Sequence, residues 1–302
     1  MVEATEVIAE TPEPPLAGPA PARRWRAALG NARVLFGGSV LLGLIVMAAG
    51  APLLAPHDPL AQDLVSSFLP PAWAPGGEAD YLLGTDSLGR DILSRLIYGA
   101  QIALTVAVVA SFFAGLIGTF LGLLAGYYGG WVDWLISRLV EIWMAFPAVL
   151  LSIVLVAVIG TGLHSVIIAI AVIDWTRFCR VVRAETMVQR RQDYVASAVT
   201  IGLTRRRTLF QEILPNVVPL LIVLFTLEMG IAIIVEAILS FVGLSVSSDT
   251  ATWGGLIQEG RLYINQVPWL MVLPMICIIL SVLGLNALGD GLRASLDPVM
   301  RR

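Results

Sequence analysis

Long apolar stretches dominate this chain and limit what it can fold into. An α-helix needs about 20 apolar residues to cross the hydrocarbon core of a bilayer. Six apolar stretches are candidate spans, at residues 34–55, 100–126, 139–160, 163–175, 217–243 and 269–288, and all but the fourth have about that length or more. The fourth is too short to cross alone at about 1.5 Å per residue, so we expect its helix to continue through Thr176. The pattern predicts an all-α membrane protein with six transmembrane helices.

The first apolar stretch also has an interpretation as a cleaved signal peptide. Ala49-Gly50-Ala51 resembles the small-residue site that a signal peptidase cuts. The stretch is long for a signal peptide, however, and an acidic extension precedes it. We therefore interpret residues 23–55 as a basic flank followed by the first transmembrane helix.

Arginines set the expected orientation, because basic residues are retained on the cytoplasmic side of a membrane. All 19 basic residues are arginines. If the N-terminus is cytoplasmic, only Arg90, Arg95 and Arg261 lie outside, and the densest group, at residues 177–207, lies inside. The sequence thus predicts that both termini face the cytoplasm.

The same pattern divides the chain into soluble and membrane parts. Residues 1–22 contain four glutamates, five prolines and little apolar material, so we expect a disordered cytoplasmic tail. Residues 56–99 form an acidic, proline-rich external loop. Five helices then occupy residues 100–298, with a long cytoplasmic connection at 176–215, and residues 299–302 form a short tail.

Several function classes are disfavoured by what the chain lacks. Without lysine it cannot contain a phosphate-binding loop of the Gly-Lys-Ser/Thr kind, so any ATP must be bound elsewhere. His57 and His164 have no cysteine or acidic cluster at ligand spacing, so no metal site is predicted. Cys179 and Cys277 are not expected to form a disulfide. The near balance of charges, −3 in total, argues against nucleic acid as a partner.

Small residues recur every four positions in the second apolar stretch. They are Ala114, Gly118, Gly122 and Gly126. This spacing places them on one face of a helix, where a second helix can approach closely. We interpret the stripe as a packing surface, which makes this span a central element of the bundle.

Three glutamates lie in or at the ends of apolar stretches: Glu141, Glu228 and Glu236. A charge in a membrane is costly unless it is paired, hydrated or near the interface, so each is a functional candidate. Glu228 is nearest the middle of its span and could line a hydrated path or relay protons. A glutamate that is hydrogen-bonded inside the bundle is an equally good interpretation of Glu228, and a better one of Glu141 and Glu236.

The cytoplasmic connection carries the most specific pattern. Small residues in Asp193-Tyr194-Val195-Ala196-Ser197-Ala198 precede Gly202, and Ile213-Leu214-Pro215-Asn216 follow. Small residues ahead of a glycine suit a short helix, a turn and close docking in a groove of another protein. The plainer interpretation is an amphipathic surface helix that stops at a glycine.

Together these stretches resemble the inner-membrane permeases of ATP-binding-cassette importers, in particular the C-type subunits of the dipeptide, oligopeptide and nickel group. The likeness extends over about residues 32–298. It rests on motifs in the same order along the chain: LGTDSLGRD at 83–91 with Ser94 and Arg95, the segment 194–216, EAILSFVGL at 236–244, Trp253-Gly254, LGDGLR at 288–293 and LDP at 296–298.

One position departs from the family pattern. The family loop reads Glu-Ala-Ala, three residues, then glycine, whereas this chain has Ala196 and Ser197 before Ala198 and Gly202. The glutamate that would form a salt bridge with an ATPase is absent. The resemblance then implies docking through shape, backbone contacts and charged neighbours such as Asp193 and Arg205. Leu214 and Pro215, at the end of the motif, belong to the same coupling loop.

The resemblance implies a multi-pass inner-membrane subunit that is not itself an enzyme and binds no cofactor. A second homologous permease would share the pathway, two ATPase subunits would bind ATP and Mg²⁺, and an external binding protein would deliver a peptide-like solute. The loop helix at 194–202 would act as a rigid lever. A self-sufficient proton-coupled transporter that uses Glu228 or Glu236 is the alternative, although no internal repeat is visible.

Overall fold

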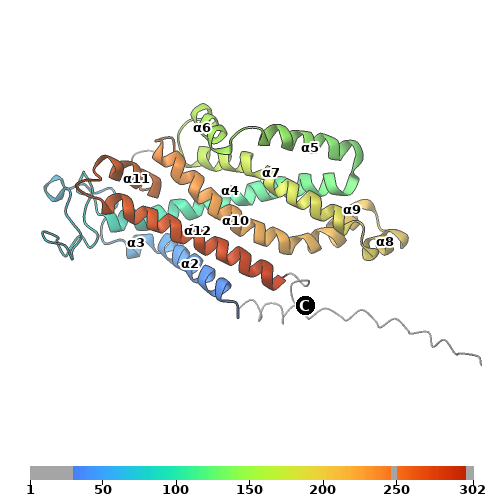
Figure 1. The fold of residues 1–302 in the computed structure, drawn as a ribbon, viewed down its shortest axis with the longest axis horizontal. Helices are drawn as coiled ribbons and strands as arrows, with labels where there is room; N and C mark the ends of the chain where they lie inside the picture. Colours follow the sequence, from blue (N-terminus) through green and yellow to red (C-terminus); the bar gives the residue numbers. More distant parts are fainter. Residues whose placement is uncertain (1–29, 246–249, 297–302) are drawn as a thin grey trace, which may run out of the picture.

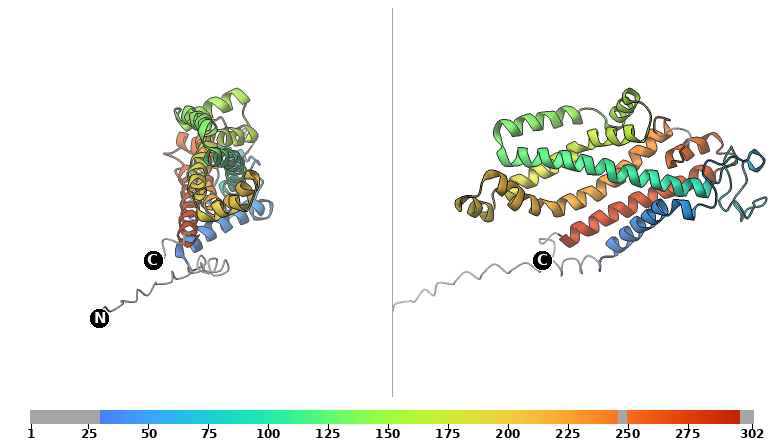
Figure 2. Two further views of the ribbon diagram at one scale, coloured as in Figure 1. Left: turned by 90° about the vertical axis from the view of Figure 1, so that its right-hand side faces the viewer. Right: turned by 180° about the vertical axis from the view of Figure 1, so that it is seen from behind.

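The computed structural model describes residues 30–245 and 250–296, so the tails predicted at 1–22 and 299–302 lie outside the described residues. Long helices run side by side along the longest dimension and form an elongated bundle (Figures 1 and 2). In chain order the helices are α2 (Ala32–Ala49), α3 (Ala51–Leu54), η1 (Leu64–Ser66), α4 (Ile92–Tyr128), α5 (Gly130–Met144), α6 (Ala148–Ile159), α7 (Leu163–Gln189), α8 (Asp193–Thr200), α9 (Arg205–Arg207), η2 (Thr208–Ile213), α10 (Leu214–Phe241), α11 (Trp253–Leu262) and α12 (Trp269–Leu296).

Four helical segments are long and apolar enough to cross a membrane: α2, α4, α10 with the turns that precede it, and α12. A fifth span results if α5 and α6 are counted together. The prediction of an all-helical membrane protein is confirmed, but by length and apolarity the described residues supply four or five spans rather than six. The difference lies in α7, whose second half is rich in charged residues.

The apolar stretch at 139–160 was wrongly predicted as one helix. Helix α5 ends at Met144 and α6 begins at Ala148, directly after Pro147, and the two helices are bent by 87°. Proline has no N–H to donate, and it keeps the preceding residue out of the helical conformation. The break therefore follows from Pro147. Hydropathy alone does not predict it, because the residues on both sides of the proline are apolar.

Helix α7 continues through Thr176 to Gln189, as expected for the fourth stretch, and packs along α4. The glycine stripe of α4 lies in this contact. A Cβ atom on Gly118 would lie 2.4 Å from the carbonyl oxygen of Trp175, and Cβ atoms on Gly122 and Gly126 would each lie 2.7 Å from carbonyl oxygens of α7. The two backbones therefore touch, which only residues without a side chain permit.

The segment 56–99, predicted as an external loop, is shorter as a loop than predicted, because α4 begins at Ile92. The carboxylate of Asp91 accepts hydrogen bonds from the backbone N–H of Ser94 at 2.9 Å and from Ser94 Oγ at 2.5 Å. Such a cap satisfies N–H groups that have no partner within the helix. The first turns of α4 carry polar residues, so the apolar stretch, which starts at residue 100, predicts a helix that begins eight residues after the true start at Ile92.

The cytoplasmic connection predicted at 176–215 is likewise mostly helical. Helix α7 occupies it up to Gln189, and α10 begins at Leu214. Between them lie α8, α9 and η2, and Figure 1 shows these elements together at one end of the bundle. They form a compact extension of α7 and α10 rather than a loose loop.

Candidate functional site

Helix α8 lies within the motif at residues 193–202, which predicts a short helix that contacts an ATPase. Asp193 is its first residue, where a carboxylate interacts favourably with the helix dipole. Gly202 follows its end with a φ of +90°, and the backbone N–H of Leu203 donates to the carbonyl of Ala198 at 3.1 Å. Residues with a side chain rarely adopt this φ, so the glycine ends the helix sharply.

The inner face of α8 is packed onto the bundle. Val195 is 3% exposed and belongs to one apolar cluster with Leu209 and Ile213 of η2 and Val182 of α7. Ala198, one turn later on the same face, is also buried. The helix is thereby packed against η2 and shares one apolar cluster with α7.

Tyr194 adds a polar connection at the same place. Its hydroxyl donates to Oε1 of Gln189, the last residue of α7, at 2.7 Å. It also accepts a hydrogen bond from Nδ2 of Asn216, in the first turn of α10, at 3.3 Å. Burial raises the pKa of the Tyr194 phenol, so the hydroxyl keeps its proton at neutral pH. One side chain therefore links three helices.

The outer face of α8 is exposed and mostly uncharged. Ala196 and Ser197 are exposed, and Ser197 Oγ donates to the carbonyl of Asp193 at 2.9 Å. Val199 and Ile201 are 55% and 77% exposed. The face is therefore a small apolar tip, with no carboxylate at position 196.

A π-helix, η2, joins α9 to α10 and was not foreseen from the sequence. Pro215 lacks the N–H that would bond to the carbonyl of Gln211, and its ring crowds that carbonyl, which favours a wider turn. Pro215 is exposed and Leu214 half-buried at the start of α10, and Arg205 is exposed on α9. These predicted docking residues lie beside α8.

Two of the three candidate glutamates have local partners. Glu236 is 1% exposed, and its carboxylate accepts hydrogen bonds from Ser240 Oγ at 2.6 Å and Ser245 Oγ at 3.3 Å. These bonds fasten the end of α10 and are typical of a structural carboxylate. Glu141 is exposed and pairs with Arg138 at 2.5 Å on α5.

Glu228 has a different environment, near the middle of α10. It is 3% exposed, and Nη1 of Arg177 on α7 lies 3.3 Å from its carboxylate. Asp174, one turn earlier on α7, is 5% exposed, with Oδ1 4.0 Å from Nε of Arg177. Asp174 was not predicted from the sequence as a candidate functional residue, and Arg177 was predicted to be one of the cytoplasmic arginines. The sequence does contain a hint of this site, because Asp174 and Arg177 are an acid and a base three residues apart at the end of an apolar stretch.

Four charged side chains join the loop before α4 and the first turn of α4 to α11, and we call this group the external clip, after the predicted external loop. Asp86 contacts Arg90 Nε at 2.7 Å and also the guanidinium of Arg95. Glu259 on α11 lies 2.9 Å from Arg95 and 3.1 Å from Arg90, and accepts from Ser87 Oγ at 2.5 Å. Burial acts to raise the pKa of Glu259, but the two arginines and Ser87 outweigh it and hold that pKa below its ordinary value of 4.5.

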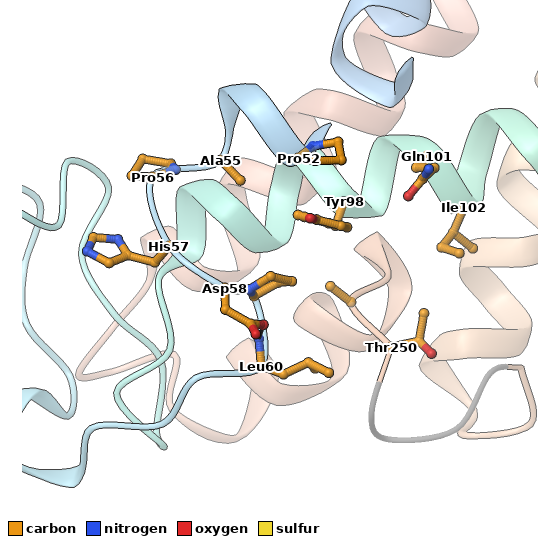
Figure 3. Close-up of a pocket in the computed structure, with 12 residues that line it drawn as sticks. Pro52, Ala55, Pro56, His57, Asp58, Leu60, Tyr98, Gln101, Ile102 and Thr250 are labelled. Atoms are coloured by element: carbon orange, nitrogen blue, oxygen red, sulfur yellow. Dashed lines mark hydrogen bonds between the residues drawn. The ribbon is translucent and has the colours of Figure 1, made fainter. Parts of the chain in front are cut away.

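A cavity of about 520 Å³ opens beside the outer end of α4 (Figure 3). Its lining comes from α3 and the segment after it, from α4 and from residues 250–251. His57 stacks on Tyr81 with ring centroids 5.0 Å apart, and its Nδ1 lies 3.7 Å from the carboxylate of Asp91. Within residues 30–245 and 250–296, no group of three or more His, Cys, Asp or Glu side chains could hold a metal ion.

Comparisons with known proteins agree with this geometry. Residues 118–302 match the family of binding-protein-dependent transport system inner membrane components, and residues 22–71 match the N-terminal transmembrane domain of oligopeptide transport permease C. The di/tripeptide permease DppC of Pseudomonas aeruginosa is 39% identical over 290 residues, 96% of each chain. The glutathione permease GsiD of Pectobacterium atrosepticum is 38% identical over 277 residues, 92% of this chain and 90% of that protein.

The fold is shared with solved structures as well. Inward-facing conformations of the MetNI methionine ABC transporter superpose with a TM-score of 0.57 at 19% identity, covering 68% of this chain and 97% of that chain. The resemblance inferred from the motifs is thus confirmed. This chain belongs to the binding-protein-dependent inner-membrane permeases of ATP-binding-cassette importers, in their dipeptide and oligopeptide C-type branch, and as such is a multi-pass transport subunit rather than an enzyme.

Proposed function

We propose that this chain forms half of the translocation pathway of an ATP-driven importer of short peptides. The two relatives described above are named for di- and tripeptides and for glutathione, which share a peptide backbone. A second, homologous permease completes the pathway, and two ATPase subunits bind ATP and Mg²⁺ in the cytoplasm. An external binding protein delivers the solute. Membership of this family disfavours the alternative of proton-coupled transport by the chain alone.

We place six spans in the inner membrane: α2, α4, the broken pair α5 and α6, α7, α10 and α12. Helix α7 has 27 residues, which is about 40 Å at 1.5 Å per residue, whereas the hydrocarbon core is about 30 Å thick. Its charges are compatible with this placement, because Arg177 pairs with Glu228. An even number of crossings puts both termini on one side, and the arginine distribution makes that side the cytoplasm.

The observation that carries the coupling proposal is the attachment of α8 to two spans at once. Tyr194 bonds to the last residue of α7 and to the first turn of α10, and Val195 is buried in the apolar cluster that also contains Val182 of α7 and Val217 of α10. A push on α8 is therefore transmitted to both helices instead of being absorbed by a loop. This stiffness is what a lever between an ATPase and a membrane pathway requires.

The contact with the ATPase is proposed to be apolar. Position 196 is alanine, so no carboxylate is offered there, while the exposed Val199 and Ile201 can enter a groove of a partner. Asp193 and Arg205 lie exposed nearby and can pair with charges on the ATPase. Gly202, with its positive φ, lets the chain turn away directly after the tip.

The proposal is tested with the complete complex, purified through a tag on this chain and reconstituted in proteoliposomes. With ATP at the ATPase side and the binding protein at the other, we expect uptake of labelled dialanine that stops when the ATPase is inactivated. Uptake by this chain alone, driven by a proton gradient, would establish the secondary transporter instead. Absence of peptide uptake, with another solute imported, would limit the proposal to an importer of that solute.

The coupling helix is tested by Gly202→Trp. There is open space around this position, so the bundle accommodates the ring, but the φ of +90° strains any side chain and the bulk stands beside the docking tip. We expect the variant to reach the membrane and to lose uptake. Unchanged uptake with the ATPases still co-purifying would show that α8 is not the docking element.

A further inference from the structure

A second, smaller cavity lies between α6, α7 and α10, near the middle of the proposed spans. Its volume is about 180 Å³, and its walls are aliphatic apart from Asp174 and Arg177. Pockets that enclose a whole small molecule are larger, roughly 300–1,000 Å³. This cavity therefore has room for one end of a solute rather than for all of it.

The charges around the cavity do not balance. Asp174 and Glu228 are both buried carboxylates, and Arg177 is the cation that faces them. Arg177 is closer to Glu228, at 3.3 Å, than to Asp174, at 4.0 Å. When both carboxylates are ionised, Arg177 is engaged by Glu228 and only distantly by Asp174, which leaves Asp174 able to bind another cation.

Asp174 is also without a hydrogen-bond donor. Its side chain is 7% exposed, and among the described residues no group donates a hydrogen bond to its carboxylate. Buried carboxylates are normally paired and hydrogen-bonded. Because Asp174 lines the cavity, its free acceptor positions are available to a group that enters there.

The cavity cannot open onto lipid. The Arg177 side chain is 38% exposed in the isolated chain, and a partly exposed arginine in mid-membrane is stable only against protein or water. This face of α7 is therefore covered by the second permease or borders a hydrated pathway. We take the face to border the hydrated pathway, so that a solute moving along the pathway passes beside Asp174.

We propose that Asp174 binds the protonated amino terminus of a short peptide during translocation, with the aliphatic wall contacting the first side chain of the peptide. A primary ammonium supplies both the missing positive charge and three hydrogen-bond donors. Glu228 has a positioning role, because it engages Arg177 and keeps Asp174 free. This assignment rests on the proposed import of peptides.

The test measures ligand binding and transport separately, on the complete complex. The probes are alaninamide, which carries a primary ammonium, and N-acetylalaninamide, which does not. We expect alaninamide to raise the thermal unfolding temperature of the complex without binding protein, and N-acetylalaninamide to leave it unchanged. In Asp174→Asn this stabilisation is lost and uptake of dialanine falls about tenfold or more, as expected for a lost charge-assisted hydrogen bond.

Two further variants separate a binding role from a structural one. Glu228→Gln releases Arg177 to pair with Asp174, so it too abolishes the response to alaninamide. Glu141→Gln removes an exposed carboxylate that pairs with Arg138 and does not line the cavity, and it retains the response. Equal stabilisation by both probes, or full stabilisation of Asp174→Asn, would overturn the proposal. If alaninamide binds in an Asp174-dependent way but dialanine is not imported, the site stands and the peptide function fails.

Discussion

Removing one charge from the external clip gives a demanding test of how the outer part of the molecule is held together. The change is Asp86→Asn. Asp86 is fully buried, and its Oδ1 accepts hydrogen bonds from the backbone N–H groups of Leu88 at 2.8 Å and Arg90 at 3.0 Å. Its Oδ2 faces the guanidinium groups of Arg90 and Arg95. Asparagine keeps the shape of this centre but removes its charge.

The magnitude follows from the charge balance. The clip contains two arginines and two carboxylates, so the variant leaves one buried positive charge without a partner. Loss of one partner from a buried ion pair costs about 3–5 kcal/mol. Because the amide still accepts a hydrogen bond, we expect the lower figure, about 3 kcal/mol, which corresponds to a roughly 100-fold increase in local opening.

Hydrogen–deuterium exchange of the complex in a lipid nanodisc measures this opening. Exchange at residues 84–91 and in α11 should accelerate by roughly 100-fold, while α4 beyond its first turns and α7 remain protected. Asp80→Asn is the matched control, because Asp80 is an exposed carboxylate in the same loop. A change of less than about threefold in the clip of a folded Asp86→Asn protein would refute the assignment of a major stabilising role.

Three other predictions concern separate parts of the chain. Gly122→Leu should abolish assembly of the complex, because even a Cβ atom at this position would lie 2.7 Å from the carbonyl oxygen of Cys179. Gly38→Leu is the control and should be tolerated, because there is open space around Gly38. The yield of purified complex measures both outcomes. Tyr194→Phe removes two hydrogen bonds, about 1–3 kcal/mol, and should lower peptide imported per ATP hydrolysed while ATPase activity persists. The lowered pKa of Glu259 stabilises the fold above pH 4.5 and this contribution is lost as the pH falls further, so the unfolding temperature should drop more steeply below pH 4.5 in the parent than in Glu259→Gln.

Much of the architecture could be predicted from the sequence, because a membrane helix is recognised from residues that are close together in the chain. Apolar length located the cores of α2, α4, α10 and α12. Glycine spacing pointed to the face of α4 that meets α7, and Gly202 indicated where α8 ends. Each of these inferences depends on residues close together in the chain.

What was missed depends on contacts between distant residues or on local backbone chemistry that competes with apolarity. Arg95 and Glu259 form one ion pair across 164 positions, and nothing in either segment indicates the partner. Arg177 looks cytoplasmic when arginines are counted, yet it pairs with Glu228 inside the bundle. The break before α6 and the π-helix before α10 both arise where Pro147 and Pro215 interrupt otherwise favourable helices.

Helix α7 connects these features mechanically. Its backbone touches the glycine stripe of α4, its middle carries Asp174 and Arg177 beside the small cavity, and Gln189 at its end bonds to Tyr194 of α8. A packed interface between backbones resists bending and favours movement as one body. If ATP binding displaces α8, α7 must move with it, so Asp174 and its surroundings shift relative to the second permease. Binding of a peptide amino terminus and the state of the ATPases would then be coupled through this one helix, and each would bias the other.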